Sequence, residues 1–327
     1  MSNGVVVVPH SLGSFIRPVA LTLPSGQVVD LVEDYRHHNA RYSDGSLLIG
    51  AGVYGSIGFN WAIQIPYAPQ FGDLLQEGEY TLRLIGDEDT CFYSAPSQGT
   101  QKVDLNLYFT NVQGLSGVNA PFDEDFQAVL RRVEEIYAQQ GISFGEVRYL
   151  NVSREVATEF AIIRDLIAAR KLMGWGRARS EDMRDNLSVD IFMVDSLVIQ
   201  GGTLLGLSGG VPGPAGLHGS SSNGLIFNSS LIGTDNEMVA HIMAHEIGHY
   251  LGLRHTTEIV TDPEFERLVG LSDPLDDTEE CPNVAQQAFD CPDAGNLMFP
   301  AAPQRANFVP SVSDGQSFVL ERNPLTY

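Results

Sequence analysis

Five residues near the end of the chain have the types and the spacing of a metal site. The stretch "AHEIGHYLGLRH" contains His245, Glu246, His249, Gly252 and His255. Histidines four positions apart lie on the same face of a helix, one turn from each other. Two neutral imidazoles placed in this way offer half of the tetrahedral ligand set that zinc prefers, at about 2.0–2.1 Å. The carboxylate of Glu246 follows the first of them and can take a proton from water without being a ligand.

A third ligand requires the chain to turn back towards the helix. Gly252 allows a sharp turn, because glycine adopts a left-handed conformation without steric cost, and His255 follows three residues later. The start of the helix is also marked. Thr234 and Glu237 form a Ser/Thr-x-x-Glu capping box, which predicts that the helix begins near Asp235. The sequence therefore predicts three histidines around one ion, with a fourth position left open as in catalytic zinc sites.

The complete string, His-Glu-x-x-His-x-x-Gly-x-x-His, resembles the signature of the metzincin clan of zinc metallopeptidases. This resemblance implies an endopeptidase that hydrolyses peptide bonds of proteins with a metal-activated water, so its partner would be a protein or peptide substrate. His245, His249 and His255 would hold one catalytic Zn²⁺, and Glu246 would act as the general base. The resemblance covers roughly residues 101 to 310. The close of the string and an Asn-x-Met turn further on look most like the pappalysin-type branch.

The clan also has a methionine turn beneath the metal, for which "GNLMFP" offers Met298 as the buried thioether. Several metzincin families have a tyrosine two residues later, which can steady the oxyanion. Here that position is Pro300. Tyr250 is not a ready substitute, because it follows His249 on the helix and is expected to point elsewhere. The resemblance thus implies Met298 as the floor of the site and leaves the group that stabilises the oxyanion unassigned.

The chain after residue 100 alternates strands with helices, which predicts an α/β layered domain over residues 101–327. By resemblance this is a metzincin-like α/β (α+β) catalytic domain with a mixed sheet and an active-site helix. We expect strands at 103–112, 142–152 and 187–199 and helices at 122–141 and 154–173. A Gly-rich stretch then leads to "LIFNSS", a short expected edge strand. An extended substrate would pair with its main chain, at Leu225, Ile226, Phe227 and Asn228.

Residues 1–100 have a different pattern, with short alternating strands between turns and no helical period. The expected strands are "VALTLPSGQVVDLV", "SLLIGAGVYG" and "EGEYTLRLIG". This pattern predicts a small all-β, sandwich-like domain. Two roles stay open for it: a docking module, or a prosegment that covers the cleft.

The charge of the chain excludes some partners. A formal net charge of −22, from 41 acidic against 19 basic residues, would repel nucleic acid and anionic membranes. No apolar run is long enough to predict a membrane span, and the first residues lack the basic region of a signal peptide. The sequence does not predict an oligomeric state.

Two cysteines bear on the compartment. Cys281 and Cys291 lie close together in "CPNVAQQAFDC", which favours a small disulfide, with free thiols as the alternative. Disulfides persist in oxidising compartments. We therefore expect a secreted or cell-surface protein, with the export signal absent from this chain.

Other polar residues have simpler interpretations. His241, one turn before the first ligand, could be a fourth ligand, but a catalytic zinc keeps one position open, so helix packing or a supporting hydrogen bond is favoured. His218 could touch substrate, although an exposed loop histidine is favoured. One acidic loop could hold Ca²⁺, but it fits no EF-hand and a solvated loop is favoured. Its acidic residues are Asp273, Asp276, Asp277, Glu279 and Glu280.

The competing interpretation is a non-enzymatic secreted or surface binding protein with a structural or inactive zinc site. Glu246 beside three histidines argues against it. A structural zinc site has no use for that carboxylate.

Overall fold

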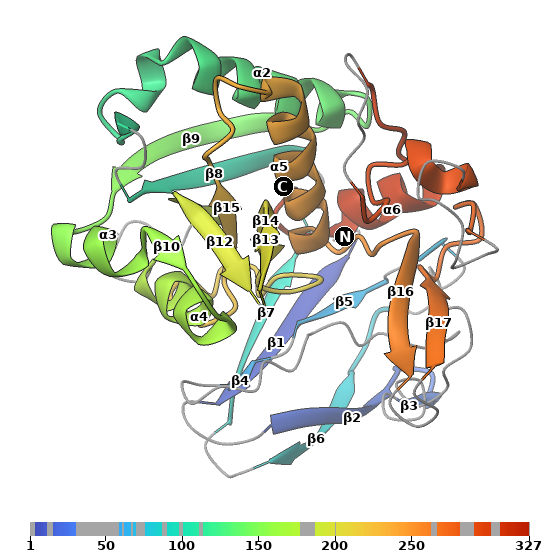
Figure 1. The fold of residues 1–327 in the computed structure, drawn as a ribbon. Helices are drawn as coiled ribbons and strands as arrows, with labels where there is room; N and C mark the ends of the chain where they lie inside the picture. Colours follow the sequence, from blue (N-terminus) through green and yellow to red (C-terminus); the bar gives the residue numbers. More distant parts are fainter. Residues whose placement is uncertain are drawn as a thin grey trace.

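A five-stranded mixed sheet lies at the centre of the chain after residue 100 (Figure 1). The computed structural model describes residues 4–11, 16–30, 59–60, 62–66, 68–69, 76–86, 90–97, 101–110, 114–176, 187–199, 201–262, 267–281, 291–301 and 308–326. Across the sheet the strand order is β14-β15-β11-β8-β9, and only β14 is antiparallel to its neighbour. These strands are β8 (Lys102–Phe109), β9 (Ser143–Asn151), β11 (Ser188–Val194), β14 (Gly206–Ser208) and β15 (Leu225–Asn228).

Helices cover both faces of this sheet because its inner strands are apolar on both sides. Successive side chains of a strand point to opposite faces. Leu107 therefore packs on one face with α2 and α5, whereas Tyr108 and Phe192 pack on the other face with α3 and α4. The helices are α2 (Glu124–Ala138), α3 (Arg154–Phe160), α4 (Leu166–Trp175), α5 (Asn236–Tyr250) and α6 (Asp314–Arg322).

The predicted order of elements is confirmed in outline and differs in detail. The helix expected over 154–173 is two helices, α3 and α4, with the short strand β10 between them. The strand expected over 187–199 divides at Asp195 into β11 and β12, and the Gly-rich stretch contains β13 and β14. Three of these strands form a small separate sheet in the order β10-β12-β13. They are β10 (Ile162–Ile163), β12 (Ser196–Ile199) and β13 (Gly202–Leu204).

The edge of the sheet is not where the sequence suggested. β15 has β11 on one side and β14 on the other, and all four of its residues, Leu225, Ile226, Phe227 and Asn228, are buried. The expectation that this strand meets substrate as an edge was therefore wrong. The edge strand is β14, a three-residue strand that starts with glycine. So short a strand has no detectable alternation of polar and apolar residues.

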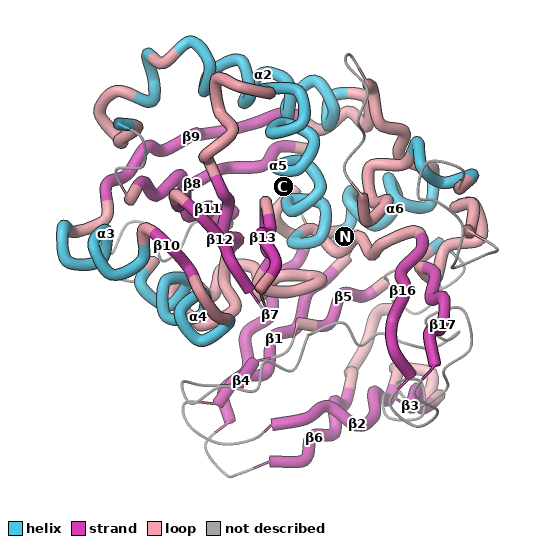
Figure 2. The backbone as a smooth tube through the Cα atoms, in the orientation of Figure 1, coloured by secondary structure: helices cyan, strands magenta, loops and turns pink. Residues whose placement is uncertain are grey.

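The described strands before residue 100 form two antiparallel sheets, seen in Figure 2 as magenta segments below the central sheet. In one, β1 pairs with β4, β5 and β7; in the other, the order is β3-β2-β6. The strands are β1 (Val5–Ser11), β2 (Ile16–Thr22), β3 (Val28–Asp30), β4 (Phe59–Asn60), β5 (Ile63–Ile65), β6 (Thr81–Gly86) and β7 (Thr90–Pro96). The expected strand "SLLIGAGVYG" lies outside the described residues. A separate sandwich-like domain of residues 1–100 stays a prediction.

All but one of the remaining described elements follow α5. β16 and β17 form a hairpin, and the disulfide between Cys281 and Cys291 is confirmed. The remaining elements after α5 are β16 (Thr257–Asp262), β17 (Arg267–Ser272) and η6 (Pro292–Gly295). The exception is η3 (Ala120–Phe122), which precedes α2. Within the described ranges, no helix has the length and apolar character that crossing a membrane requires.

Candidate metal centre

The helix that carries the first two histidines is capped at both ends. At its start, the Asp235 carboxylate accepts a hydrogen bond from the Met238 N–H at 3.1 Å, so the cap is Asp235 rather than the predicted Thr234. At its end, the Leu253 N–H reaches the Gly248 carbonyl and the Gly252 N–H reaches the His249 carbonyl. This is a Schellman motif, with Gly252 at a φ of +106°. The predicted glycine turn is therefore confirmed.

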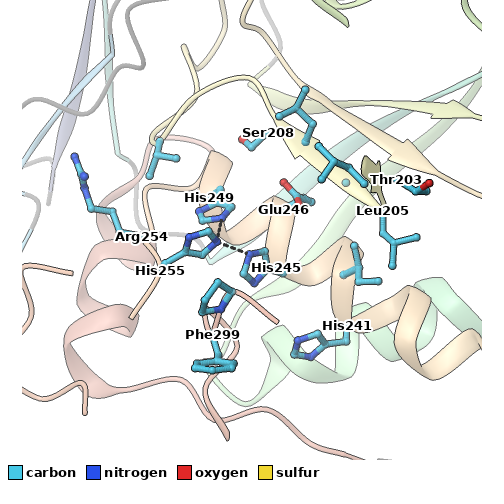
Figure 3. Close-up of a pocket in the computed structure, with 16 residues that line it drawn as sticks. Thr203, Leu205, Ser208, His241, His245, Glu246, His249, Arg254, His255 and Phe299 are labelled. Atoms are coloured by element: carbon cyan, nitrogen blue, oxygen red, sulfur yellow. Dashed lines mark hydrogen bonds between the residues drawn. The ribbon is translucent and has the colours of Figure 1, made fainter. Parts of the chain in front are cut away.

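The side chains of His245, His249 and His255 converge on one point (Figure 3). Nε2 of His255 lies 3.1 Å from Nε2 of His245 and 3.1 Å from Nε2 of His249. Tetrahedral zinc with bonds of about 2.0–2.1 Å would place its nitrogen ligands about 3.3 Å apart. The three nitrogens are thus spaced as ligands of one ion.

The positions of the imidazole protons are also those expected around a bound cation. Nδ1 of His245 lies 2.8 Å from the Leu297 carbonyl, and Nδ1 of His249 lies 2.8 Å from the Leu253 carbonyl. Each Nδ1 must donate to its carbonyl, so both Nε2 atoms present lone pairs towards His255. His255 can donate a proton to only one of them. A cation at the centre satisfies all three nitrogens, which a hydrogen-bonded cluster of neutral imidazoles cannot do.

Burial keeps the helix histidines in the form that binds metal. It lowers the pKa of His245 to about 3, with the neighbouring His255 as the next cause. Burial also lowers the pKa of His249 well below its usual value, reinforced by the other two histidines. Both imidazoles are therefore neutral at physiological pH, as metal ligands must be.

Glu246 lies between α5 and the edge strand β14. Its carboxylate accepts a hydrogen bond from the Ser208 N–H, and a β-carbon built on Gly206 would come within 2.3 Å of Glu246 Cγ. Only glycine at 206 leaves room for this side chain. Burial raises the pKa of Glu246 to about 8, and the Ser208 N–H opposes that shift. A cation held by the histidines would lower the pKa again.

Met298, the predicted floor of the site, packs against α5 at Gly248. The residue is fully buried, and a β-carbon on Gly248 would lie 2.8 Å from its sulfur. Gly248 therefore lets the thioether approach the turn of α5 between the two ligand histidines. Tyr250 points away from the site, as expected, because its hydroxyl donates to Asn223 in the buried interior. Pro300 is exposed and lines the cleft.

A cleft of about 550 Å³ opens beside the three histidines. Its described lining comes entirely from residues 203 to 300. The lining includes Leu205 and all three residues of β14, together with Ile242 and Phe299. Leu205 and Phe299 are labelled in Figure 3. His241 also lines this cleft, but it is not part of the group that converges on one point. Its ring packs against Phe308 and its buried Nδ1 has no hydrogen-bond partner. The ring packing expected for His241 is observed, whereas the supporting hydrogen bond is not.

One expectation outside the cleft needs correction, and the possible calcium site gains no support. The side chain of His218 is only 6% exposed, and its Nδ1 lies 2.8 Å from the Asp190 carboxylate, so it is not an exposed loop histidine. In the acidic loop, the Asp277 carboxylate accepts hydrogen bonds from Ser313 and Gly315 at the start of α6. Asp273 accepts from its own loop, at the Leu275 N–H and the Thr278 hydroxyl. Nothing in the described part of the loop supports a calcium site.

The sequence missed the residues that hold Glu246. Ser208 and Gly206 act through a backbone N–H and through the absence of a side chain, and neither leaves a residue-type signal. The glycine-rich composition before β15 was the available sign that backbone approaches another element closely there.

No protein-family model and no curated protein matches the chain. Among solved structures, it is similar to an archaemetzincin from Methanopyrus kandleri, with 14% identity and a TM-score of 0.34, over 68% of this chain and 88% of that one. It is also similar to metalloproteinase-II from Bacteroides fragilis, with 16% identity and a TM-score of 0.33, over 49% of this chain and 44% of that one. Both likenesses are distant. The chemistry of the site has to be judged from its own geometry.

Proposed function

We propose that the chain is a zinc-dependent endopeptidase of the metzincin type, which hydrolyses peptide bonds of proteins. One observation carries the proposal: three convergent imidazole nitrogens share a cleft with the carboxylate of Glu246. Catalytic zinc sites have three protein ligands and an open position, whereas structural sites are closed by four. The pappalysin-type branch is the finer form of the proposal, supported by the Gly252 and Met298 turns of the sequence.

The residues of the cleft have different proposed roles in the reaction. His245, His249 and His255 would hold the zinc ion. When bound, zinc supplies Lewis acidity towards water and towards the scissile carbonyl. Glu246 would accept a proton from water and later donate it to the leaving amine. The Ser208 N–H holds the Glu246 carboxylate in place for both transfers.

We propose that substrate lies extended along β14. Within the described residues this strand pairs only with β15, so its outer edge, apart from the Ser208 N–H bonded to Glu246, can pair with the main chain of a peptide. β14 also contacts Glu246 through Gly206 and Ser208. A peptide paired with β14 would therefore lie next to the proposed general base.

The test compares two glutamates of the same helix. Glu246→Gln should lower kcat on a protein substrate by roughly 10²–10⁴-fold, with zinc content unchanged, because it removes the proton acceptor and leaves the ligands intact. Glu237→Gln makes the same chemical change on the exposed first turn of α5, where Glu237 pairs with Arg132, and should leave kcat unchanged. The proposal fails if the zinc-loaded protein cleaves no protein substrate, or if Glu246→Gln cleaves as well as the parent.

The alternative is a non-enzymatic binding protein with an inactive zinc site. It predicts that the parent and Glu246→Gln both bind zinc and that neither cleaves a protein substrate. We also propose that the protein is secreted or at the cell surface. The disulfide supports this, because such bonds persist in oxidising compartments.

A further inference from the structure

A glutamine from the first hundred residues lies buried against the metal centre. Gln64, in the middle of β5, is only 1% exposed. Its Nε2 donates to the Val319 carbonyl of α6 at 2.8 Å, and its Oε1 accepts from Nδ2 of Asn323 at 3.0 Å. A buried amide costs free energy unless its groups are hydrogen-bonded. Gln64 meets that requirement with partners more than 250 positions away in the chain.

Asn323 connects this glutamine to the end of α5. Its Nδ2 also donates to the Leu251 carbonyl at 3.1 Å, and Asn323 is fully buried. Leu251 is the C-cap of α5. Carbonyls at the end of a helix have no partner within the helix. The side chain of Asn323 supplies that partner and ties the helix end to Gln64.

The next residue, Gly252, lies directly against Gln64. A β-carbon on Gly252 would be 2.8 Å from Gln64 Oε1 and 3.2 Å from Val319 Cγ1. The turn of residues 251–253 is therefore held from one side by two buried amides. Residues of the N-terminal and C-terminal parts of the chain meet at this point.

The same turn sets two of the three ligands. The Leu253 carbonyl accepts the Nδ1 proton of His249 and so fixes which nitrogen faces the metal. His255 follows two residues after Leu253, so the direction of the turn decides where the third imidazole lies. A shift of the turn would move both His249 and His255 relative to His245.

We infer that Gln64 and Asn323 are positioning residues of the metal centre, and that the sheet containing β5 is a structural part of that centre. This inference rests on the metal site of the proposed function but not on peptidase activity. It assigns the N-terminal part of the chain a role other than a detachable docking module or a prosegment. In agreement, the described lining of the cleft contains no residue before 203.

The test measures zinc affinity in the full chain by competition with a chelator. Gln64→Leu and, separately, Asn323→Asp should each weaken zinc binding roughly 10-fold or more, the usual effect of removing a group that orients a metal ligand. Asn323→Asp keeps the oxygen that accepts from Leu325 N and removes the donors to Gln64 and Leu251. The absorption spectrum of bound Co²⁺ should also change in both variants, because it reports the geometry of the ligands.

Ser97→Ala is the matched control. Ser97 is buried and donates to the Glu321 carbonyl of α6 at 3.2 Å, so it joins the same two parts of the chain without touching the turn. Zinc affinity and the Co²⁺ spectrum should stay those of the parent. Parent-like affinity in both amide variants, or an equal loss in Ser97→Ala, would overturn the inference. A parent that binds zinc but cleaves nothing would end the peptidase proposal and leave this inference standing.

Discussion

The metal centre has a helix-borne half and a loop-borne half, and they are held in different ways. The backbone of α5 places His245 and His249 on one face, through its helical period and the cap at Asp235, and the turn after the helix adds the carbonyl that orients the His249 ring. His255 lies beyond the helix, and its position depends on residues from distant parts of the chain, including Gln64 and Asn323. Local sequence rules therefore place two ligands, and long-range packing places the third.

The contacts behind each half confirm this difference. On the helix-borne half, the Tyr137 hydroxyl of α2 donates to the Ala244 carbonyl of α5 at 2.8 Å. The conformation of α5 does not depend on this bond, because a helix is formed by its own backbone hydrogen bonds. Behind the loop, the Thr256 N–H donates to the Met298 carbonyl and its hydroxyl to the Asp293 carboxylate at 2.6 Å. The loop is thus held by the segment 291–301, in addition to Gln64 and Asn323. We expect the loop-borne half to be the more sensitive of the two to substitution.

Gly252→Ala should have the largest effect. At a φ of +106° an alanine is strained, and its β-carbon would lie 2.8 Å from Gln64 Oε1. Backbone strain and overpacking each cost about 1–3 kcal/mol, so the free energy of unfolding should fall by about 3 kcal/mol. Zinc affinity should fall with it, because the turn that carries His255 must move. Denaturant titration of the metal-free protein and chelator competition measure the two effects.

Gly201→Ala separates strain from close contact. Gly201 has a φ of +80° and nothing within 4 Å of a built β-carbon, so alanine there is strained without a clash. Its unfolding free energy should fall by about 1–3 kcal/mol while zinc affinity stays that of the parent. If Gly201→Ala and Gly252→Ala weaken zinc equally, the turn has no special role in placing the third ligand.

The same division explains how much of the site could be predicted. The helix, its histidines and Glu246 follow from a motif whose members are close in sequence, and Met298 follows from a second short motif, "GNLMFP", further along the chain. β14 was missed because "GLS" is too short to show a period, and a fourfold run of buried residues in "LIFN" was mistaken for the edge. Gln64 was missed because its partners lie about 255 positions away, although one polar residue inside the buried run "AIQIP" was a detectable anomaly.

The buried carboxyl of Asp273 should make the free energy of unfolding depend on pH, which tests the packing around the loop-borne half. Asp273 lines a small cavity with Gly252, Leu253 and Arg254, and it is 1% exposed. Burial raises the pKa of its carboxyl from 3.8 to about 7, against the hydrogen bond from Thr278. Between these values the unfolded chain has lost the proton and the folded chain retains it, so the free energy of unfolding falls as pH rises, by up to about 1.4 kcal/mol per pH unit.

Asp273→Asn keeps the acceptor oxygen and cannot ionise, so it should remove that slope. The unfolding free energy of the metal-free variant should exceed that of the parent increasingly from pH 4 to pH 7, and the difference should level off above pH 7. Denaturant titrations at several pH values measure it. Asp276→Asn, in the exposed part of the same loop, is the control and should keep the slope of the parent. Parallel pH curves for the parent and Asp273→Asn would show that the carboxyl is ionised throughout.

The smallest effect is expected in the helix-borne half, at His241. Its buried Nδ1 has no hydrogen-bond partner, and burial lowers its pKa to about 4, so it is neutral and unsatisfied. His241→Leu should raise the unfolding free energy by about 1 kcal/mol, because an unpaired buried polar group is replaced by an apolar one of similar size. Zinc affinity should not change, since only His245 and His249 of this helix face the ion. A loss of zinc affinity in His241→Leu would instead make His241 a ligand, and the helix would then supply more of the site than the loop.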